Sequence, residues 1–394
     1  MGRRKKILIL YISERSGHRY AASAVEKALK YLDAGVDILS IDGFNYTNPL
    51  LERVISRTYL GVIRRTPEVW DYLYDNPKVL KRVKGFREMI HRHNSGKLKT
   101  LLDEFRPDVI VCTQAFPCGM VADFKKSFSM NVPLIGVVTD YVAHSYWIFE
   151  NVDFYIVPSS EARDKLIGSA VLPQKVKVYG IPVDPDFTRP CNKNEIILKL
   201  GLDLKAPVIL VMGGSQGLGP LKKIITSLSN LENTLQIIIV TGTNKRLLES
   251  LKKVKVPLRH KVLLLGHVNN ISELMDISTI LVTKPGGITV TEAITKQLPM
   301  VIVQPLPGQE AKNTEFLLKS RLALQAESTK DLPHIISKLL EHPAQISALK
   351  ERYKVFTKPN AAETIAQFVL DLAENYADVS VIQNGTSSGP GASA

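Results

Sequence analysis

Short apolar runs alternate with helix-period segments along the whole chain. The runs are rich in β-branched residues and do not alternate with polar positions, which is typical of strands buried on both faces of a parallel sheet. We predict six strands in the first half and five in the second: Lys6–Tyr11, Val36–Ile41, Val109–Cys112, Leu134–Val138, Phe154–Val157 and Val176–Tyr179, then Val208–Met212, Ile237–Thr241, Val262–Leu265, Ile280–Thr283 and Val301–Gln304. Helix-period segments lie between them, among them Ala21–Leu32, Ser272–Met275 and Glu310–Lys319. This order predicts an α/β fold of two doubly wound domains.

A Pro-rich stretch without periodicity, residues 180–192, separates the two halves. We therefore expect one domain over residues 1–190 and a second over 191–358. An amphipathic segment follows, and we expect a helix within residues 359–378. The Gly/Ser/Ala-rich end, residues 379–394, is expected to be disordered.

The composition is that of a folded protein, with 45% hydrophobic and 23% charged residues in 394. No uncharged stretch approaches the roughly 20 apolar residues that span a bilayer. The N-terminus lacks the pattern of a signal peptide, and Lys6 stands where myristoylation needs Ser or Thr. Three cysteines without paired spacing suit a reducing compartment. We expect a cytoplasmic protein that can sit on a membrane without crossing it.

Lys and Arg exceed Asp and Glu by 51 to 38, which suggests an anionic partner. Residues 50–100 hold 12 of the basic residues and 5 acidic ones, interleaved with bulky apolar and aromatic side chains. Arg64, Arg65 and Trp70 are typical of this stretch. It is either a membrane-surface element or an amphipathic helix with a solvated basic face, and the sequence leaves both open.

Three Gly-rich or polar turns follow predicted strands of the second half. In open α/β sheets, ligands bind at such carboxyl ends of strands, and helix N-termini favour phosphate oxygens. The turns match neither the dinucleotide fingerprint nor the P-loop, which weakens the case for a nicotinamide cofactor or an NTPase. Each alone could be a tight turn, but together they are much more specific. Their candidate residues are Gly213, Gly214 and Ser215; Lys284, Pro285, Gly286, Gly287, Thr289 and Glu292; and Gln309, Glu310 and Asn313.

Glu292 is predicted about one turn into the second of these helices. A carboxylate there can accept two hydrogen bonds from a vicinal diol such as ribose, although a first-turn acid also simply suits the helix dipole. Gln309, Glu310 and Asn313 offer adjacent donors and acceptors that suit a polyhydroxyl ring.

The first half places His18 in a loop directly after its first strand, before a helix expected near Tyr20. Such a histidine could act as a general base near neutral pH. Asp140, His144 and Trp147 follow another predicted strand in the same half. No set of His, Cys and acidic residues has metal-ligand spacing, so we expect no metal and no cofactor.

In this order, the motifs resemble the family of monogalactosyldiacylglycerol synthases and processive diacylglycerol glucosyltransferases, which belongs to glycosyltransferase family 28. The resemblance runs from Ile7 to about Leu372. It rests on these stretches: Gly17-His18, Thr139-Asp140 with His144 and Trp147, Gly180-Ile181-Pro182, Thr283-Lys-Pro-Gly-Gly-Ile-Thr, Thr291-Glu292-Ala293 and Pro307-Gly308-Gln309-Glu310. The family usually has further glycines before the histidine, where this chain has Glu14-Arg15-Ser16.

The resemblance implies a GT-B fold, two Rossmann-like domains facing each other across a cleft, with the last helix crossing back to the first domain. It also implies transfer of glucose or galactose from UDP-glucose or UDP-galactose to diacylglycerol, with the glycolipid product as a possible second acceptor. Uracil would face the backbone around Val268. Gly17, His144 and Trp147 would lie on the acceptor side, and Arg64, Arg65 and Trp70 on an anionic membrane surface.

These expectations lead to an inverting mechanism. Residues 213–217 and 286–287 would hold the diphosphate, Glu292 the ribose, and Gln309 and Glu310 the hexose hydroxyls. His18 would remove the proton from the acceptor hydroxyl, with Asp140 as a second base or a positioner.

Two other functions remain open. One is transfer of N-acetylglucosamine to a lipid-linked peptidoglycan precursor, and the other is nucleotide-sugar or membrane binding without catalysis. Nucleic-acid binding lacks a recognition motif.

Overall fold

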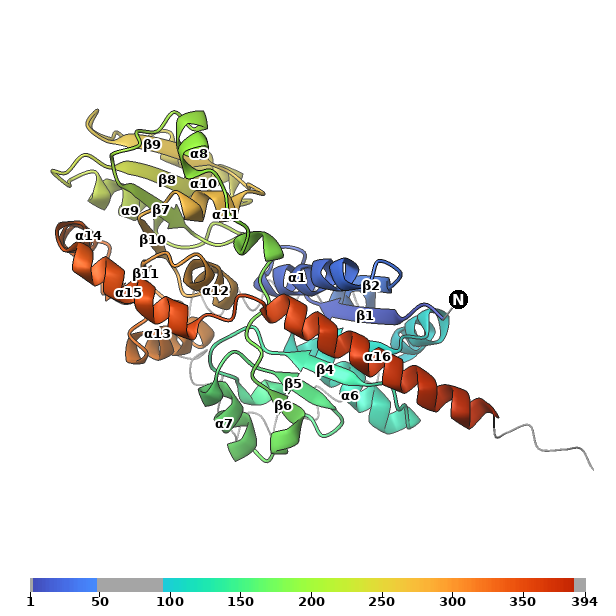
Figure 1. Ribbon diagram of the computed structural model, residues 1–394. Coiled ribbons are helices and arrows are strands. Elements are labelled where there is room, and N and C mark those ends of the chain that lie inside the picture. Colours follow the sequence, from blue (N-terminus) through green and yellow to red (C-terminus); the bar gives the residue numbers. More distant parts are fainter. Residues whose placement is uncertain (1–2, 48–94, 386–394) are drawn as a thin grey trace, which may run out of the picture.

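The computed structural model describes residues 3–47 and 95–385, and these form two α/β domains, each around a six-stranded parallel sheet (Figure 1). The strand order is β2-β1-β3-β4-β5-β6 in the N-terminal sheet and β12-β11-β10-β7-β8-β9 in the C-terminal sheet. All ten strand pairs are parallel. The predicted fold class, two doubly wound domains, is therefore confirmed.

In the N-terminal domain the strands are β1 (Lys6–Tyr11), β2 (Asp37–Asp42), β3 (Val109–Cys112), β4 (Leu134–Val137), β5 (Phe154–Ile156) and β6 (Val176–Lys177). Its helices are α1 (Gly17–Leu32), α2 (Gly43–Thr47), α6 (Ala115–Phe128) and α7 (Ser160–Gly168), with short 3-10 turns η1 (Ser145–Trp147), η2 (Pro173–Lys175) and η3 (Pro185–Phe187). Residues 95–105 are also helical. Strands β3 and β4 are wholly buried, as their unalternated apolar runs predict.

In the C-terminal domain the strands are β7 (Val208–Met212), β8 (Gln236–Val240), β9 (Lys261–Leu265), β10 (Ile280–Thr283), β11 (Met300–Val303) and β12 (Leu324–Ala326). Its helices are α8 (Lys193–Lys199), α9 (Leu221–Leu228), α10 (Lys245–Leu251), α11 (Ile271–Asp276), α12 (Gly287–Thr295), α13 (Gln309–Lys319), α14 (Leu332–Glu341) and α15 (Pro343–Phe356). Strand β12 is the one strand of the described residues that the pattern did not predict, because Leu-Gln-Ala is short and contains no β-branched residue.

Helix α1 begins earlier than predicted, and this corrects the expected place of His18. The Ser16 side chain caps the helix by accepting a hydrogen bond from the Arg19 N–H. The helix therefore starts at Gly17, and His18 lies in its first turn rather than in a preceding loop.

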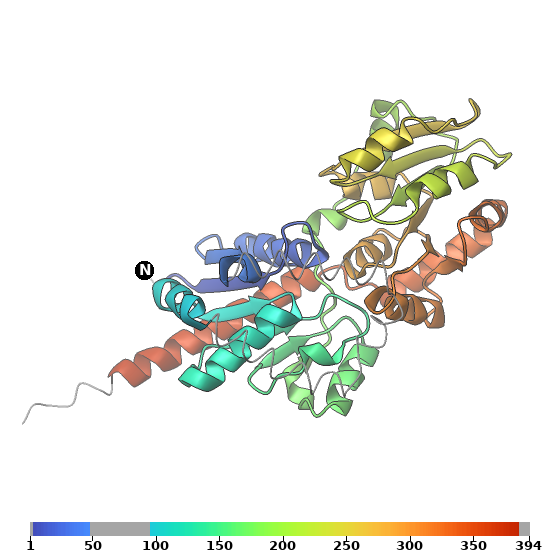
Figure 2. The ribbon, with the colours of Figure 1, turned by 180° about the vertical axis from the view of Figure 1, so that it is seen from behind.

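The chain passes between the domains twice, and the two passages touch. Gly180 has a positive φ of 103°, and a Cβ there would lie 3.0 Å from Lys358 Cβ and 3.1 Å from Ala361 Cβ. A glycine is thus needed where the passages cross. The last helix, α16 (Ala361–Gly385), then packs against α1 and β3 of the N-terminal domain (Figures 1 and 2).

Helix α16 continues past residue 378, where we expected the disordered end to begin. No Pro or Gly interrupts the segment before Gly385, so nothing local stops the helix earlier. Residues 386–394 lie outside the described part, as do most of residues 50–100, including Arg64, Arg65 and Trp70. Among the residues that the structure describes, every helix is too short or too polar to cross a membrane.

Candidate functional site

The Gly-rich turn after β7 is folded tightly on itself. A Cβ on Gly213 would lie 2.6 Å from the Leu218 carbonyl oxygen, and one on Gly217, where φ is +58°, would lie 2.1 Å from the Thr241 carbonyl oxygen. Only glycine fits at these two positions. The result is a compact turn at the carboxyl end of β7, in which the backbone at Gly213 and Gly217 packs directly against other backbone atoms.

This turn contacts the other domain through the loop before α1. Ser215 Oγ donates a hydrogen bond of 2.7 Å to the Arg15 carbonyl oxygen, and the Gln216 amide donates to the same oxygen at 3.4 Å. The loop that contains Glu14-Arg15-Ser16, where this chain differs from the family pattern, therefore contacts the Gly-rich turn.

The start of α12 forms the second turn. Gly286 precedes the helix and a Cβ there would meet nothing within 4 Å, whereas one on Gly287 would lie only 1.9 Å from the Thr139 carbonyl oxygen of the N-terminal domain. Thr289 lies in the first turn and is partly buried. The first N–H groups of α12 thus lie at the domain boundary, where a helix N-terminus can bind an anion.

Lys284 connects this turn to the other two. Its ammonium forms an ion pair with the Glu310 carboxylate, and its Cε would lie 3.3 Å from a Cβ on Gly214. Glu310 is largely buried and also accepts a hydrogen bond from the Leu306 N–H at 2.9 Å. The structure therefore brings the three turns of the C-terminal domain together, and it places one cation among them.

The start of α13 reaches across to the segment after β4. Asn313 Nδ2 donates to Asp140 Oδ1 and to the Pro285 carbonyl oxygen, each at 3.0 Å, and Asn313 Oδ1 accepts from the Tyr141 N–H at 3.0 Å. Gln309 Nε2 donates to the Val142 carbonyl oxygen at 3.3 Å. In this structure the polar atoms of Asn313 are thus directed to protein groups.

Asp140 is held between the two domains. Burial raises the pKa of its carboxyl to about 6; the hydrogen bonds from Asn313 and Gln309 oppose this rise, as does Lys284, and Glu310 adds to it. The group is therefore mostly ionised at pH 7, and it becomes protonated as the pH falls through 6.

His18 lies at the carboxyl ends of three neighbouring strands. Its Nδ1 is 3.0 Å from the Thr113 carbonyl oxygen and 3.0 Å from Thr139 Oγ1. A carbonyl can only accept, so Nδ1 carries the proton and Nε2 keeps its lone pair. Burial lowers the pKa of His18 to about 4 in spite of the bond to Thr113. The imidazole is therefore neutral at physiological pH, with Nε2 as its basic atom.

Glu292 lies in the second turn of α12. Burial raises the pKa of its carboxyl to about 8, and Asp184 contributes. Tyr20 of α1 lies near it: burial raises the pKa of the Tyr20 hydroxyl, and the Glu292 carboxylate adds to this rise. The Tyr20 hydroxyl is also 3.5 Å from His267 Nε2. Val268 follows His267 in the loop after β9 and is partly buried. A largely protonated Glu292 can donate one hydrogen bond and accept another.

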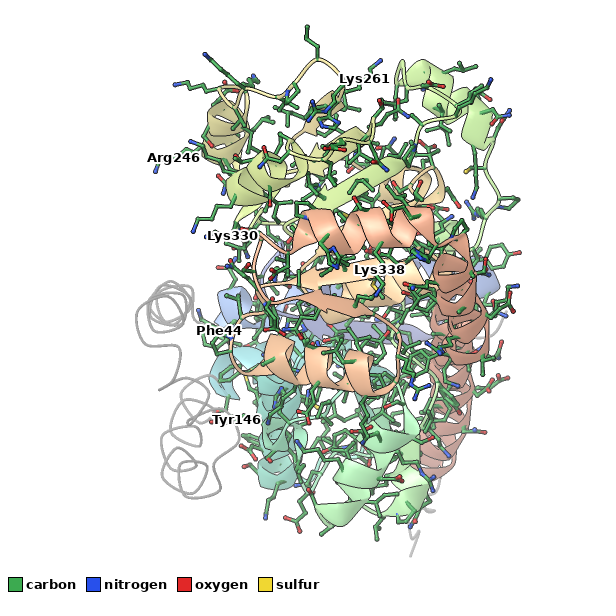
Figure 3. All side chains as sticks on the ribbon, turned by 90° about the vertical axis from the view of Figure 1, so that its left-hand side faces the viewer. Phe44, Tyr146, Arg246, Lys261, Lys330 and Lys338 are labelled. Carbon is green, nitrogen blue, oxygen red and sulfur yellow. The ribbon has the colours of Figure 1, made fainter. Side chains whose placement is uncertain are left out.

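The predicted acceptor side contains a group of rings. His144 contacts the rings of Tyr146 and Trp147 at centroid distances of 5.7 and 6.2 Å, and Phe44 contacts Phe116 at 4.4 Å. Figure 3 shows Phe44 and Tyr146 on the same side of the N-terminal domain. Trp147 is almost fully buried in the core, so it supports this face from beneath.

Gly17, the remaining predicted residue of this side, is exposed at the start of α1. A Cβ there would lie 3.1 Å from Ile288 Cγ1, so the glycine lets α1 approach α12. In residues 3–47 and 95–385, no three His, Cys, Asp or Glu side chains form a group that could hold a metal ion.

Sequence reasoning identified Asp140, Gln309 and Asn313, but it did not identify Tyr141 and Thr113 as residues of the site. The Tyr141 hydroxyl lies 2.8 Å from Thr291 Oγ1, and Thr113 and Thr139 flank the His18 ring. The one sequence signal of Tyr141 and Thr113 is that each stands within three residues of a predicted strand end. The contact between Tyr141 and Thr291 also depends on how the two domains dock.

Comparison with known proteins bears on both halves of the chain. A model of the monogalactosyldiacylglycerol (MGDG) synthase family matches residues 18–183, and a model of the glycosyltransferase family 28 C-terminal domain matches residues 208–365. His18 and Asp140 fall within the first match, and the three turns of the C-terminal domain fall within the second.

Whole-chain relatives agree with these matches. Processive diacylglycerol beta-glucosyltransferases from Bacillus pumilus and Bacillus subtilis are 28% identical over 375 and 377 residues, covering 95% of this chain and 97% of each relative. Among solved structures, MurG from Acinetobacter baumannii is similar with a TM-score of 0.62 and 15% identity, over 93% of this chain and 99% of MurG. That likeness supports the GT-B fold.

Proposed function

The chain belongs to the family of MGDG synthases and family 28 glycosyltransferases, and on that premise we propose that it transfers glucose or galactose from a UDP-sugar to diacylglycerol at a membrane surface. The Bacillus relatives are processive diacylglycerol beta-glucosyltransferases, which supports diacylglycerol as the acceptor. The match of the N-terminal half to the MGDG synthase model favours diacylglycerol over a peptidoglycan precursor.

The observation that carries the proposal is the meeting of two kinds of group at the domain boundary. From the C-terminal domain come a compact Gly-rich turn, the N-terminus of α12 and Lys284, all suited to a diphosphate. From the N-terminal domain come a neutral His18 and the Asp140 carboxylate. An activated donor and a base are the two requirements of direct displacement at a sugar carbon.

In the proposed mechanism the donor is bound by the C-terminal domain. The N–H groups of Gly213, Gly214 and Gly287 stabilise the charge that develops on UDP as it leaves. The Gly286 N–H instead donates to the Lys284 carbonyl oxygen at 2.9 Å and holds the turn before α12. Lys284 lies close enough to Gly214 to share its ammonium between Glu310 and the diphosphate. These groups are fixed before the donor arrives, so little reorganisation opposes the reaction.

Three further contacts orient the nucleotide and the sugar. Glu292 binds the ribose, and the backbone near Val268 faces the uracil. Gln309 and Glu310 lie at the first turn of α13, where their side-chain oxygens accept hydrogen bonds from the hexose hydroxyls. The hexose is thus held at the edge of the C-terminal domain that faces His18.

His18 then takes the proton of the acceptor hydroxyl on Nε2 while the acceptor oxygen bonds to the anomeric carbon and the bond to UDP breaks. A single displacement inverts that carbon, so an α-linked donor gives a β-glycoside. The lipid acceptor reaches the site from the side of the aromatic group around His144, and the basic residues of the 50–100 stretch bind anionic lipid.

An assay with UDP-glucose or UDP-galactose and diacylglycerol vesicles tests the proposal. We expect a β-linked monoglycosyl lipid, and faster turnover on vesicles with anionic lipid than on neutral ones, with a difference that shrinks as salt is added. Product linkage is read by NMR and rate by release of UDP. An α-linked product would contradict the displacement, and equal turnover on both vesicles at low salt would contradict the membrane contact.

A further inference from the structure

Asn313 joins the two domains at the proposed site, and its hydrogen bonds define what it can do. The side chain is fully buried. Both N–H bonds of its amide are used, one on Asp140 Oδ1 and one on the Pro285 carbonyl oxygen, and its oxygen accepts from the Tyr141 N–H. An amide with both donors engaged has no N–H left for a sugar hydroxyl.

We propose that Asn313 is a positioning residue, which holds the Asp140 carboxylate toward the acceptor site from the opposite domain and does not bind the sugar. This inference rests on the proposed function and deepens it, because it assigns Asp140 a charge-dependent role in the transfer.

The geometry favours this role over a purely structural one. Asn313 lies on α13, whereas Asp140 lies in the loop after β4, so their hydrogen bond forms only when the two domains are docked. Asp140 follows Thr139, whose hydroxyl is 3.0 Å from His18 Nδ1. The amide therefore connects donor-domain docking to the carboxylate next to the base. Gln309 contributes from the same helix turn through its contacts with Val142 and Asp140.

The charged groups around Asp140 make the role measurable. Lys284 and Glu310 face it from the C-terminal domain and form an ion pair with each other, while His18 on the N-terminal side is neutral. Burial holds the Asp140 pKa at about 6, and the Asn313 amide opposes a further rise. Below pH 6 the carboxyl becomes protonated and its charge is lost. We therefore expect kcat/KM to decrease on the acid side with an apparent pKa near 6. This apparent pKa should change when the Asn313 amide is replaced.

The test is the near-isosteric Asn313→Asp in the full-length protein. It replaces an N–H donor with a second carboxylate, which raises the Asp140 pKa. We expect kcat to fall roughly 10- to 100-fold and the acid limb to move to higher pH, while the Kd for UDP stays within about threefold of wild type. Asn313→Ser, which adds no charge, is the second variant: it should lower kcat with a smaller shift of the limb. Asp140→Asn should remove the limb near pH 6 from the residual activity.

The inference would be overturned if both Asn313 variants had the kcat of the wild type and the same apparent pKa on the acid side of the pH profile. A large loss of selectivity between UDP-glucose and UDP-galactose with an unmoved limb would overturn it too, because Asn313 would then be a sugar ligand. Failure of the proposed function is distinct from either result, since it shows as absent UDP binding and absent transfer in the wild-type protein.

Discussion

Replacing His18 by Ala should lower kcat by about 100- to 10,000-fold, the usual contribution of a general base. His18 Nδ1 donates to the Thr113 carbonyl oxygen, so Nε2 holds the lone pair that the mechanism needs. UDP is bound by the other domain in this account, and its Kd should therefore stay close to that of the wild type. Steady-state rates and calorimetry on the same preparation separate the two effects.

His18→Asn is the matched control for this prediction. Its amide N–H can keep the hydrogen bond to Thr113, but it has no basic nitrogen. It should therefore be as inactive as His18→Ala while folding as the wild type does. Turnover near the wild-type rate in His18→Asn would show that the role of His18 is its hydrogen bond to Thr113 and not the acceptance of a proton.

The pH dependence follows from the two groups that must carry the right charge. Asp140 is ionised above its pKa of about 6, and His18 is neutral above its pKa of about 4. As the pH falls, kcat/KM should first decrease through pH 6, and more steeply only near pH 4. A single limb near 6.5 that disappears in His18→Ala would instead mean that His18 titrates as an ordinary histidine.

Replacing Gly287 by Ala should lower kcat/KM by roughly 10- to 100-fold, as expected for the 1–3 kcal/mol cost of overpacking. Its Cβ would lie 1.9 Å from the Thr139 carbonyl oxygen, and that atom belongs to the backbone of the other domain, so the domains must move apart. This separation lengthens the contacts of Asn313 with Asp140 and with Tyr141.

Gly96→Ala is the control for Gly287→Ala. A Cβ on Gly96 meets nothing within 4 Å, and this glycine lies in a helix far from the boundary in sequence. Its rate should be that of the wild type. Small-angle scattering should show a more extended Gly287→Ala variant, and its melting temperature should fall, because the buried cluster that contains Ala21, Tyr141 and Ile288 crosses the domain boundary. Wild-type kcat/KM in Gly287→Ala would contradict the docked arrangement as the active one.

Much of the fold could be predicted because buried parallel strands leave a strong sequence pattern. Unalternated β-branched runs such as Val208–Met212 have no other common explanation between helices. The edge strand β12 lacks that signal. The predicted start of α1 near Tyr20 is wrong, because Ser16 caps the helix and its first residue is Gly17.

The candidate site was predictable only up to the domain boundary. Strand ends indicate that Gly286 and Glu310 gather at one edge of the C-terminal sheet, because parallel strands finish at one edge of a sheet. The pairing of Lys284 with Glu310 and of Asn313 with Asp140 depends on packing between residues far apart in the chain. Periodicity contains no information about such docking, so the role of Asn313 emerged from the structure.

Calorimetric titration of the purified protein with UDP at modest salt tests the central claim most directly, because every step proposed here depends on a diphosphate held by the C-terminal domain. We expect saturable binding of UDP and of UDP-glucose or UDP-galactose with a Kd below about 1 mM, the usual upper range for enzyme substrates, and weaker binding by Glu292→Ala, which removes both the donor and the acceptor. If the wild-type protein retains neither UDP nor either UDP-sugar, the account is wrong.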